Sequence, residues 1–206
     1  MNPDRKIRIL DPEILYDGFN KLSRLLYRYR RANGAWSDPV EREIFRRGPA
    51  AAVLPYDPVR DRLVLIEQFR PGAYLAGTDA WQLEPVAGIC EPGEAPEETL
   101  RREALEEAGC KVDALVPIVS YHVSPGCVDE TVSVYCGRTD ASDVASVAGD
   151  PGEQEETRVH VLDFGEALEN LNAGAYGYAL TIISLQWLAL NRQDLRKRWL
   201  QTPPAT

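Results

Sequence analysis

Residues 88–110 read Gly88-Ile-Cys-Glu-Pro-Gly-Glu-Ala-Pro-Glu-Glu-Thr-Leu-Arg-Arg-Glu-Ala-Leu-Glu-Glu-Ala-Gly-Cys110, a glycine-rich loop followed by a strongly helical segment. Pro96 suits a first helical turn, where its missing N–H costs nothing, and Gly109 suits a left-handed helix end. The segment therefore predicts a helix between these two residues. Its apolar side chains recur at helical spacing on one face: Leu100, Ala104 and Ala108.

The acids in the first turn of this helix have an ordinary explanation. Glu97 and Glu98 stand at the N-terminal end, where the helix dipole favours negative charge. They also precede Arg101 and Arg102 by four residues, the favourable order for helical ion pairs. A solvated helix surface accounts for both acids.

The acids in the last two turns require a different explanation. Glu103, Glu106 and Glu107 crowd the negative end of the dipole, and Glu103 and Glu107 are a like-charged i,i+4 pair. Arg102 can offset Glu106 but cannot serve all three carboxylates. A divalent cation between them removes the repulsion, and hard oxygen ligands of this kind suit Mg²⁺ or Mn²⁺. The sequence therefore predicts a metal site at this helix.

Length and composition limit the class of protein. With 206 residues and 44% hydrophobic residues, the chain can bury one substantial core plus a small appendage. The net charge of −9 argues against a general nucleic-acid surface. No apolar run reaches the ~20 residues that span a bilayer, no signal-peptide pattern is seen, and the four cysteines lack zinc spacing. We expect a cytoplasmic protein with reduced thiols.

Residues 1–48 predict a separate β element. Apolar and polar side chains alternate through residues 25–30, the period of a strand with one solvated face. A turn at Asn33-Gly34 separates this strand from a second extended run at residues 40–45. A ribbon this small cannot bury its own apolar side, so it must pack on the main domain or on another subunit.

The same element carries a group of arginines, Arg24, Arg28, Arg30 and Arg31. Two interpretations are open. The group either binds a polyanion or is the solvated face of the strand, whose alternation it follows.

Residues 49–200 predict an α/β domain. We expect strands at 50–56, 63–69, 81–86, 112–116, 131–136 and 158–162, and helices at 164–171 and 179–190. The polar segment 140–157 is too long for an ordinary connection, and loops of this length are usually functional or disordered. Its acids are a candidate second catalytic cluster or simply solvated loop charge: Glu153, Glu155 and Glu156.

The segment 88–110 resembles the box of the Nudix hydrolases, G-x5-E-x7-R-E-U-x-E-E-x-G-U. Every fixed position is matched, while the two U positions, Ala104 and Cys110, are small rather than bulky. The resemblance implies an α/β fold of α+β type: an α/β/α sandwich on a mixed sheet, here with a small N-terminal antiparallel β element. The matched residues are Gly88, Glu94, Arg102, Glu103, Glu106, Glu107 and Gly109.

Flanking segments resemble the ADP-ribose pyrophosphatases of that superfamily over nearly the whole chain, including Leu65-Ile-Glu-Gln68 with Arg70, Glu84-Pro-Val-Ala-Gly88 and Ser124-Pro-Gly126. This implies hydrolysis of ADP-ribose to AMP and ribose 5-phosphate by a homodimer with exchanged N-terminal strands. One alternative is a hydrolase of another nucleoside diphosphate sugar, such as GDP-mannose. Another is a non-catalytic ADP-ribose sensor in transcription, against which the intact box and the lack of a DNA-binding element argue.

The resemblance also implies roles for individual residues. Glu103, Glu107 and the Ala87 carbonyl would bind Mg²⁺ or Mn²⁺ with help from Glu106, while Glu94 and Arg102 would brace the loop. The general base would come from the long loop, where Glu153 matches best and Glu155 is close enough to exchange roles with it. Phe19 would stack on adenine, Arg42 would face the nucleotide and Arg70 would clamp the diphosphate. Further substrate contacts are implied for Glu84, Ser124, Pro125 and Glu130.

Overall fold

The computed structural model describes residues 6–149 and 156–201. The chain divides into two compact units. The first comprises residues 1–49 with 121–132, and the second comprises residues 50–120 with 133–206. No helix in the described part of the chain has the length and apolar character that crossing a bilayer requires.

The second unit is organised around an eight-stranded mixed sheet. Its strands follow the order β10-β11-β5-β4-β9-β8, with β6 paired to β5 and β7 paired to β4. Strand β4 lies inside the sheet, and its run of apolar residues is buried on both faces. The strands are β4 Pro49–Asp57, β5 Arg62–Phe69, β6 Trp81–Glu84, β7 Val86–Ile89, β8 Ala114–His122, β9 Thr131–Arg138, β10 Val147–Ala148 and β11 Thr157–Asp163.

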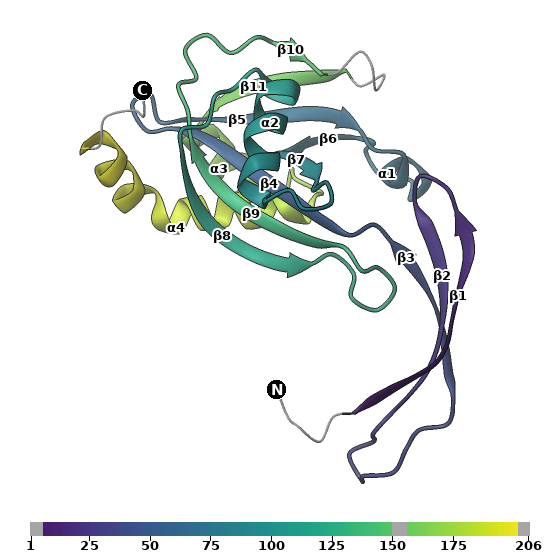
Figure 1. Cartoon of the computed structure of the whole chain (residues 1–206). Coiled ribbons are helices and arrows are strands. Elements are labelled where there is room, and N and C mark those ends of the chain that lie inside the picture. The colour runs from purple at the N-terminus through teal and green to yellow at the C-terminus, as the bar shows by residue number, and fades with distance from the viewer. Residues whose placement is uncertain (1–5, 150–155, 202–206) are drawn as a thin grey trace. The chain divides into compact units, whose positions relative to one another are not determined.

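Helices cover both faces of this sheet (Figure 1). Helix α2 (Pro96–Ala108) packs on the face to which β5 contributes Val64 and Ile66. Helices α3 (Phe164–Asn172) and α4 (Ala179–Gln201) pack on the opposite face, which receives Leu63 and Leu65. The alternation of side chains along one strand therefore builds two cores. The predicted α/β/α sandwich is confirmed.

Helix α2 has the predicted ends. Pro96 is at its first positions, and Gly109 caps it in the left-handed conformation with φ of 60°. Its predicted apolar face is fully buried: Leu100, Ala104 and Ala108. Because this face packs against the sheet, it determines how the helix is rotated and therefore where its acidic side chains lie.

Both first-turn acids are exposed, as predicted, but their hydrogen bonds go to residues other than the arginines four positions on. Glu97 accepts a hydrogen bond from the Tyr135 hydroxyl at 2.8 Å, and Glu98 accepts one from the backbone N–H of Ala95 at 3.1 Å. Arg101 donates to the Val112 carbonyl. The i,i+4 rule failed because tertiary and capping partners outcompete neighbours on an exposed helix surface.

Four other segments differ from the sequence prediction. The strand expected at 81–86 is two strands, β6 and β7, because Pro85 has no N–H for a ladder and the chain passes from pairing with β5 to pairing with β4. The strand expected at 112–116 runs instead from Ala114 to His122. Helix α4 continues past 190 to Gln201, since Leu195 and Trp199 extend its buried face. The short helix α1 (Pro71–Leu75) was not predicted.

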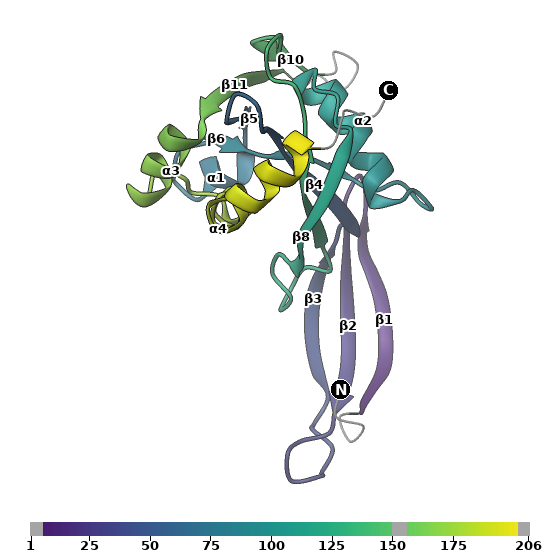
Figure 2. The same ribbon diagram turned by 90° about the vertical axis from the view of Figure 1, so that its left-hand side faces the viewer.

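The first unit contains a three-stranded antiparallel sheet in the order β1-β2-β3 (Figure 2). Its strands are β1 Ile7–Asp17, β2 Lys21–Tyr29 and β3 Val40–Arg46. Strand β1 was not predicted, because register shifts after Ile9 and Ile14 break its alternation. Every residue of β1 is exposed. Many of these exposed side chains are large and apolar: Ile7, Ile9, Leu10, Ile14, Leu15 and Tyr16.

Asp57, the last residue of β4, is a buried carboxylate that accepts several hydrogen bonds. Its side chain is 1% exposed and accepts the backbone N–H groups of Val59 at 2.8 Å, Arg60 at 3.0 Å and Ala141 at 3.1 Å. The Arg60 guanidinium adds a contact at 3.0 Å. Burial alone would raise the pKa of Asp57, but the hydrogen bonds from Arg60 and Ala141 outweigh burial and hold the pKa below its ordinary value.

Replacing Asp57 with Asn should lower the free energy of unfolding by about 1–3 kcal/mol at pH 7, because an amide cannot accept every one of these bonds. The depressed pKa gives stability that is complete above the unfolded pKa of about 3.9 and is lost as pH falls through the folded pKa. Urea unfolding between pH 7 and pH 3 should therefore show the gap between wild type and Asp57→Asn closing in acid.

The matched control is Asp163→Asn, which removes an exposed pair with Arg62 and should cost about 0–1 kcal/mol. A gap that stays constant down to pH 3 would show that the ionised form of Asp57 contributes nothing to stability.

Candidate active site

Two of the predicted metal ligands lie against strand β7. The Glu107 side chain is buried, at 7% exposed, and its Oε2 accepts the backbone N–H of Ala87 at 3.3 Å. The Glu103 side chain lies over Gly88 so closely that a Cβ there would stand 2.0 Å from Glu103 Oε1. Gly88 is therefore required by close approach of a carboxylate rather than by its backbone angles.

A network around Arg102 holds the other acids of the box. Glu94 accepts the backbone N–H of Glu91 at 3.0 Å, the largest cause that keeps the pKa of Glu94 below its ordinary value. The Arg102 guanidinium is 3.4 Å from Glu94, 2.8 Å from Glu103 and 3.1 Å from Glu106. One arginine thus links the loop before α2 to two carboxylates on the helix.

Arg70 and Glu84 form a bidentate ion pair that the sequence analysis missed. Glu84 is fully buried and accepts hydrogen bonds from Arg70 Nε at 2.7 Å and Nη2 at 2.6 Å. Burial works to lower the pKa of Arg70, but Glu84 and, more weakly, the charge of Glu107 keep it above its ordinary value. The Arg70 side chain remains 40% exposed. One edge of a guanidinium is therefore fixed in place within the electrostatic reach of the acidic helix.

Gln68 is a further polar residue on this face that we did not predict to be part of the site. Side-chain alternation places it on the side of Ile66, and Ile66 pairs with Glu84 across the β5–β6 ladder. Its side chain is 7% exposed, and its Oε1 has no hydrogen-bond partner in the described part of the chain. The signal available in the sequence was its position two residues before Arg70.

Five of the remaining predicted site residues belong to the first unit. Phe19 is 90% exposed in the first unit, and Arg42, also in that unit, donates to the Glu41 carbonyl at 2.7 Å. The loop with Ser124 and Pro125 belongs to the same unit, as does Glu130, whose carboxylate is 3.6 Å from Arg47.

The two candidate general bases, Glu153 and Glu155, lie outside the described residues.

The donor atoms on α2 and β7 are oxygens, the type of ligand that a hard divalent cation prefers. Glu103 and Glu107 supply carboxylate oxygens beside the strand that contains Ala87, the donor chemistry that Mg²⁺ and Mn²⁺ prefer. Within residues 6–149 and 156–201, no three Asp, Glu, His or Cys side chains converge on one metal-binding point. The observed fit therefore rests on two side chains placed against one strand.

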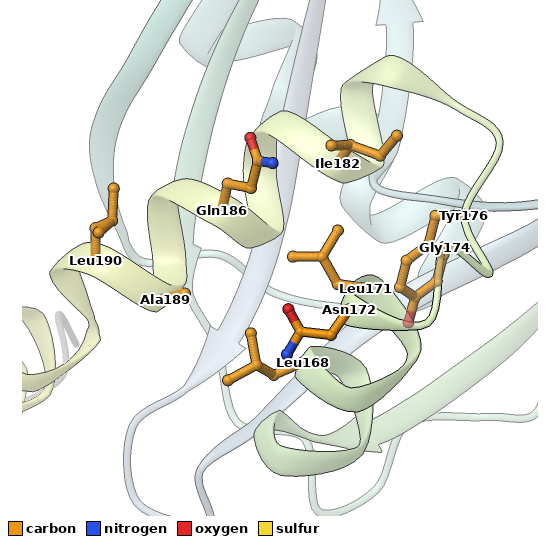
Figure 3. A pocket seen from close by; sticks show the side chains of 9 residues that line it. All are labelled: Leu168, Leu171, Asn172, Gly174, Tyr176, Ile182, Gln186, Ala189 and Leu190. Carbon is orange, nitrogen blue, oxygen red and sulfur yellow. The ribbon is translucent and has the colours of Figure 1, made fainter.

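A separate groove of about 570 Å³ lies between α3 and α4, lined mainly by leucine, isoleucine and alanine side chains (Figure 3). It is on the sheet face opposite α2. Its lining residues include none of the predicted site residues: Leu168, Leu171, Asn172, Gly174, Tyr176, Ile182, Gln186, Ala189 and Leu190.

Comparison with known proteins gives relatives over almost the whole chain. An ADP-ribose pyrophosphatase of Escherichia coli (strain K12) is 44% identical over 193 residues, which cover 94% of this chain and 92% of the relative. The ADP-ribose pyrophosphatase of Haemophilus influenzae is 36% identical over 94% of this chain and 90% of its own length. A GDP-mannose pyrophosphatase of Cronobacter sakazakii is 33% identical over 89% of this chain and 95% of its own length.

A solved structure described as an ADP compounds hydrolase has the same fold. It matches with a TM-score of 0.65 at 20% sequence identity, covering 90% of this chain and 96% of that chain. The signature of the NUDIX domain matches residues 46–180, which include the acidic helix, Arg70 and Glu84. The predicted family is confirmed: the chain belongs to the NUDIX family.

Proposed function

We propose that this chain hydrolyses the diphosphate bond of ADP-ribose to AMP and ribose 5-phosphate with a divalent metal ion. The observation that carries the proposal is the placement of two carboxylates of α2, Glu103 and Glu107, against β7, with Glu107 within electrostatic reach of Arg70. Acids that can hold a cation thus stand within electrostatic reach of a guanidinium that can hold a diphosphate. ADP-ribose is favoured because the E. coli ADP-ribose pyrophosphatase is 44% identical to this chain.

Glu103, Glu107 and the Ala87 carbonyl would hold the metal, Mg²⁺ or alternatively Mn²⁺, and Glu106 would assist. Such a cation supplies Lewis acidity and neutralises phosphate charge. Glu94 acts at a distance: it orients Arg102, which in turn touches Glu103 and Glu106.

Arg70 would bind the diphosphate with the part of its guanidinium that Glu84 leaves exposed. Because Glu84 fixes Nε and Nη2, little side-chain freedom is left to lose on binding. A rigid donor of this kind favours one orientation of the substrate. Gln68, with its unpartnered amide oxygen on the same face, is a candidate to accept a hydrogen bond from the substrate.

The first unit would supply the base-binding part of the site. We infer that Phe19 stacks on adenine, worth about 1–3 kcal/mol, and that Arg42 faces the nucleotide. Ser124, Pro125 and Glu130, in the same unit, would line the remainder of the substrate site.

We further infer a homodimer with exchanged N-terminal strands and no nucleic-acid partner. The exposed apolar side chains of β1 support the dimer, because contiguous exposed apolar surface marks an interaction site. The four free cysteines support a cytoplasmic location, which recovery of the protein in the periplasmic fraction would contradict.

A second candidate function is hydrolysis of GDP-mannose, favoured by the 33% identical C. sakazakii relative. Mass spectrometry of the products with Mg²⁺ should show AMP and ribose 5-phosphate from ADP-ribose, with kcat/KM at least about tenfold above that for GDP-mannose. The opposite substrate ratio would assign the alternative function.

Replacing Glu107 with Gln should abolish this turnover, since the neutral amide keeps the shape of the side chain but loses its charge.

Replacing Gly88 with Ala should weaken Mn²⁺ binding by about 10–100-fold while the fold survives. The added methyl displaces the end of a flexible side chain, Glu103, rather than the backbone. Electron paramagnetic resonance of free Mn²⁺ measures the change. Gly165→Ala is the matched control, since a Cβ there meets nothing within 4 Å. An unchanged Mn²⁺ affinity in Gly88→Ala would remove Glu103 from the ligand set.

The general base is assigned to Glu153, with Glu155 as the alternative. Glu153→Gln should lower kcat by about 10²–10⁴-fold with little change in substrate affinity. A large loss in Glu155→Gln with almost none in Glu153→Gln would reverse the two roles. Steady-state kinetics of both variants decides between them.

Light scattering at micromolar concentration should give twice the 23.0 kDa of one chain. Joint replacement of Ile7 and Ile9 by Glu should shift the protein towards monomer, because it places charge in the exposed apolar strand. A monomeric wild type would overturn the exchanged dimer.

A further inference from the structure

The two faces of the β1-β2-β3 sheet differ in chemistry. Side chains alternate between faces along each strand, so the ladder register sorts them. One face carries apolar and aromatic side chains such as Ile7, Ile9, Tyr27 and Tyr29, which pair directly across β1 and β2. The other face carries charged side chains, among them the Arg8–Arg28 pair.

The charged face is compensated in its middle. Arg24 lies 2.5 Å from Glu13, 3.7 Å from Asp11 and 3.9 Å from Glu41. Each acid comes from a neighbouring strand, so this part of the face satisfies its own charges. These carboxylates balance the charge of Arg24, although its buried Nε has no hydrogen-bond partner in the described part of the chain.

One end of the same face is not compensated. Arg8 and Arg28 are directly opposite each other, and Arg30 follows two residues on. Arg30 also bridges to Trp36, and the guanidinium groups of Arg8 and Arg30 lie 5.0 Å and 4.8 Å from the Trp36 ring centroid. We call Arg8, Arg28, Arg30 and Trp36 the arginine–tryptophan cluster.

In the described part of the chain, no acidic side chain offsets the repulsion between the arginines of the cluster. Directly opposed like charges destabilise a strand pair, yet no Asp or Glu of the described chain lies within 4.0 Å of the guanidinium nitrogens of Arg8, Arg28 or Arg30. Within the described residues, the buried Nε of Arg28, like that of Arg24, has no hydrogen-bond partner. Neighbouring Arg31, in contrast, pairs with Asp38 at 3.2 Å. The chain has 32 acids against 23 basic residues, so a shortage of acids does not explain the gap.

We propose that the arginine–tryptophan cluster is a binding site for a compact anion with linked phosphate groups, a diphosphate or longer. Guanidinium forks bind phosphate oxygens bidentately. Three of them on one face suit at least two linked anionic groups, although one Arg30 nitrogen already donates to the Gly34 carbonyl. Stacking on Trp36 orders Arg8 and Arg30 in advance, which reduces the side-chain entropy lost on binding.

The site is independent of the proposed catalysis. Its residues all belong to the first unit, and none has a proposed role in metal binding or hydrolysis. It also lies on the face opposite the apolar side chains that a second subunit is proposed to cover. Failure of the proposal would therefore leave the hydrolase assignment untouched.

The test is calorimetric titration of the full chain with inorganic pyrophosphate in EDTA, where metal-dependent turnover is absent. Wild type should show a saturable site that Arg8→Gln with Arg28→Gln weakens by at least about tenfold. The matched control is Arg62→Gln with Lys111→Gln, which removes two exposed positive charges from the second unit and should bind as wild type. Binding that the cluster variant leaves intact belongs to another site.

Two further variants separate binding geometry from charge and from folding. Arg8→Lys with Arg28→Lys keeps the charge but loses the forks, so its affinity should fall between wild type and the Gln variant. Trp36→Leu keeps all three arginines and should weaken binding by losing their preorganisation. Should the Gln variant unfold by circular dichroism, these two variants decide the question, and wild-type affinity in both would overturn the proposal.

Parallel titrations with different ligands identify the molecule that supplies the phosphates. Equal affinity for pyrophosphate and ADP assigns recognition to the phosphate chain, and tighter binding of ADP adds the nucleoside; both support the proposal. Absence of saturable binding to either overturns it. So does much tighter binding of a single-stranded oligonucleotide that depends on the cluster, which would make the cluster a nucleic-acid surface.

Discussion

The site depends on how closely helix α2 approaches strand β7. Leu100, Ala104 and Ala108 are fully buried against the sheet, and the small size of the two alanines brings the helix near enough for Glu103 to lie over Gly88. The same contact carries Glu107 to the backbone N–H of Ala87. A bulkier residue at 88 or 104 would push the carboxylates away from the strand. The small residue at 104, which departs from the bulky aliphatic of the box pattern, thus belongs to the packing that places the acids.

The helix and its acids were predictable because their causes are local. Pro96, Gly109 and a stripe of three apolar residues specify an element and its buried side without reference to the rest of the chain. The strands at 50–56 and 63–69 were likewise predictable, because each is a short, mainly apolar run next to a turn. Spacing alone showed only that the carboxylates in the last two turns repel one another. The Nudix resemblance then assigned metal binding to them.

The failures of prediction have non-local causes. Arg70 and Glu84 are 14 residues apart, and only the β5–β6 ladder brings them together. The partners of Glu97 and Arg101 are Tyr135 and Val112, which tertiary packing supplies. Strand β1 was missed because two register shifts disrupt its alternation. In each case the deciding contact lies beyond the window from which a sequence pattern is read.

The charge balance of the site explains why a cation belongs to the proposed reaction. Among the side chains assigned to the site, five carboxylates face two guanidiniums, so the formal charge of this set is −3. Arg70 and Arg102 are already engaged by Glu84 and by acids of the box. The carboxylates are Glu84, Glu94, Glu103, Glu106 and Glu107.

A diphosphate carries further negative charge, so this group of side chains alone would repel it. Divalent ions bound by these carboxylates would reverse the sign of the local field. The buried Arg70–Glu84 pair then also has a role in orientation. Removing Glu84 would leave Arg70 charged but no longer held in one orientation. Removing Arg70 would leave a buried carboxylate without a compensating charge, which would cost more folding stability. Cations would therefore provide attraction for the substrate, and the ion pair would provide its alignment.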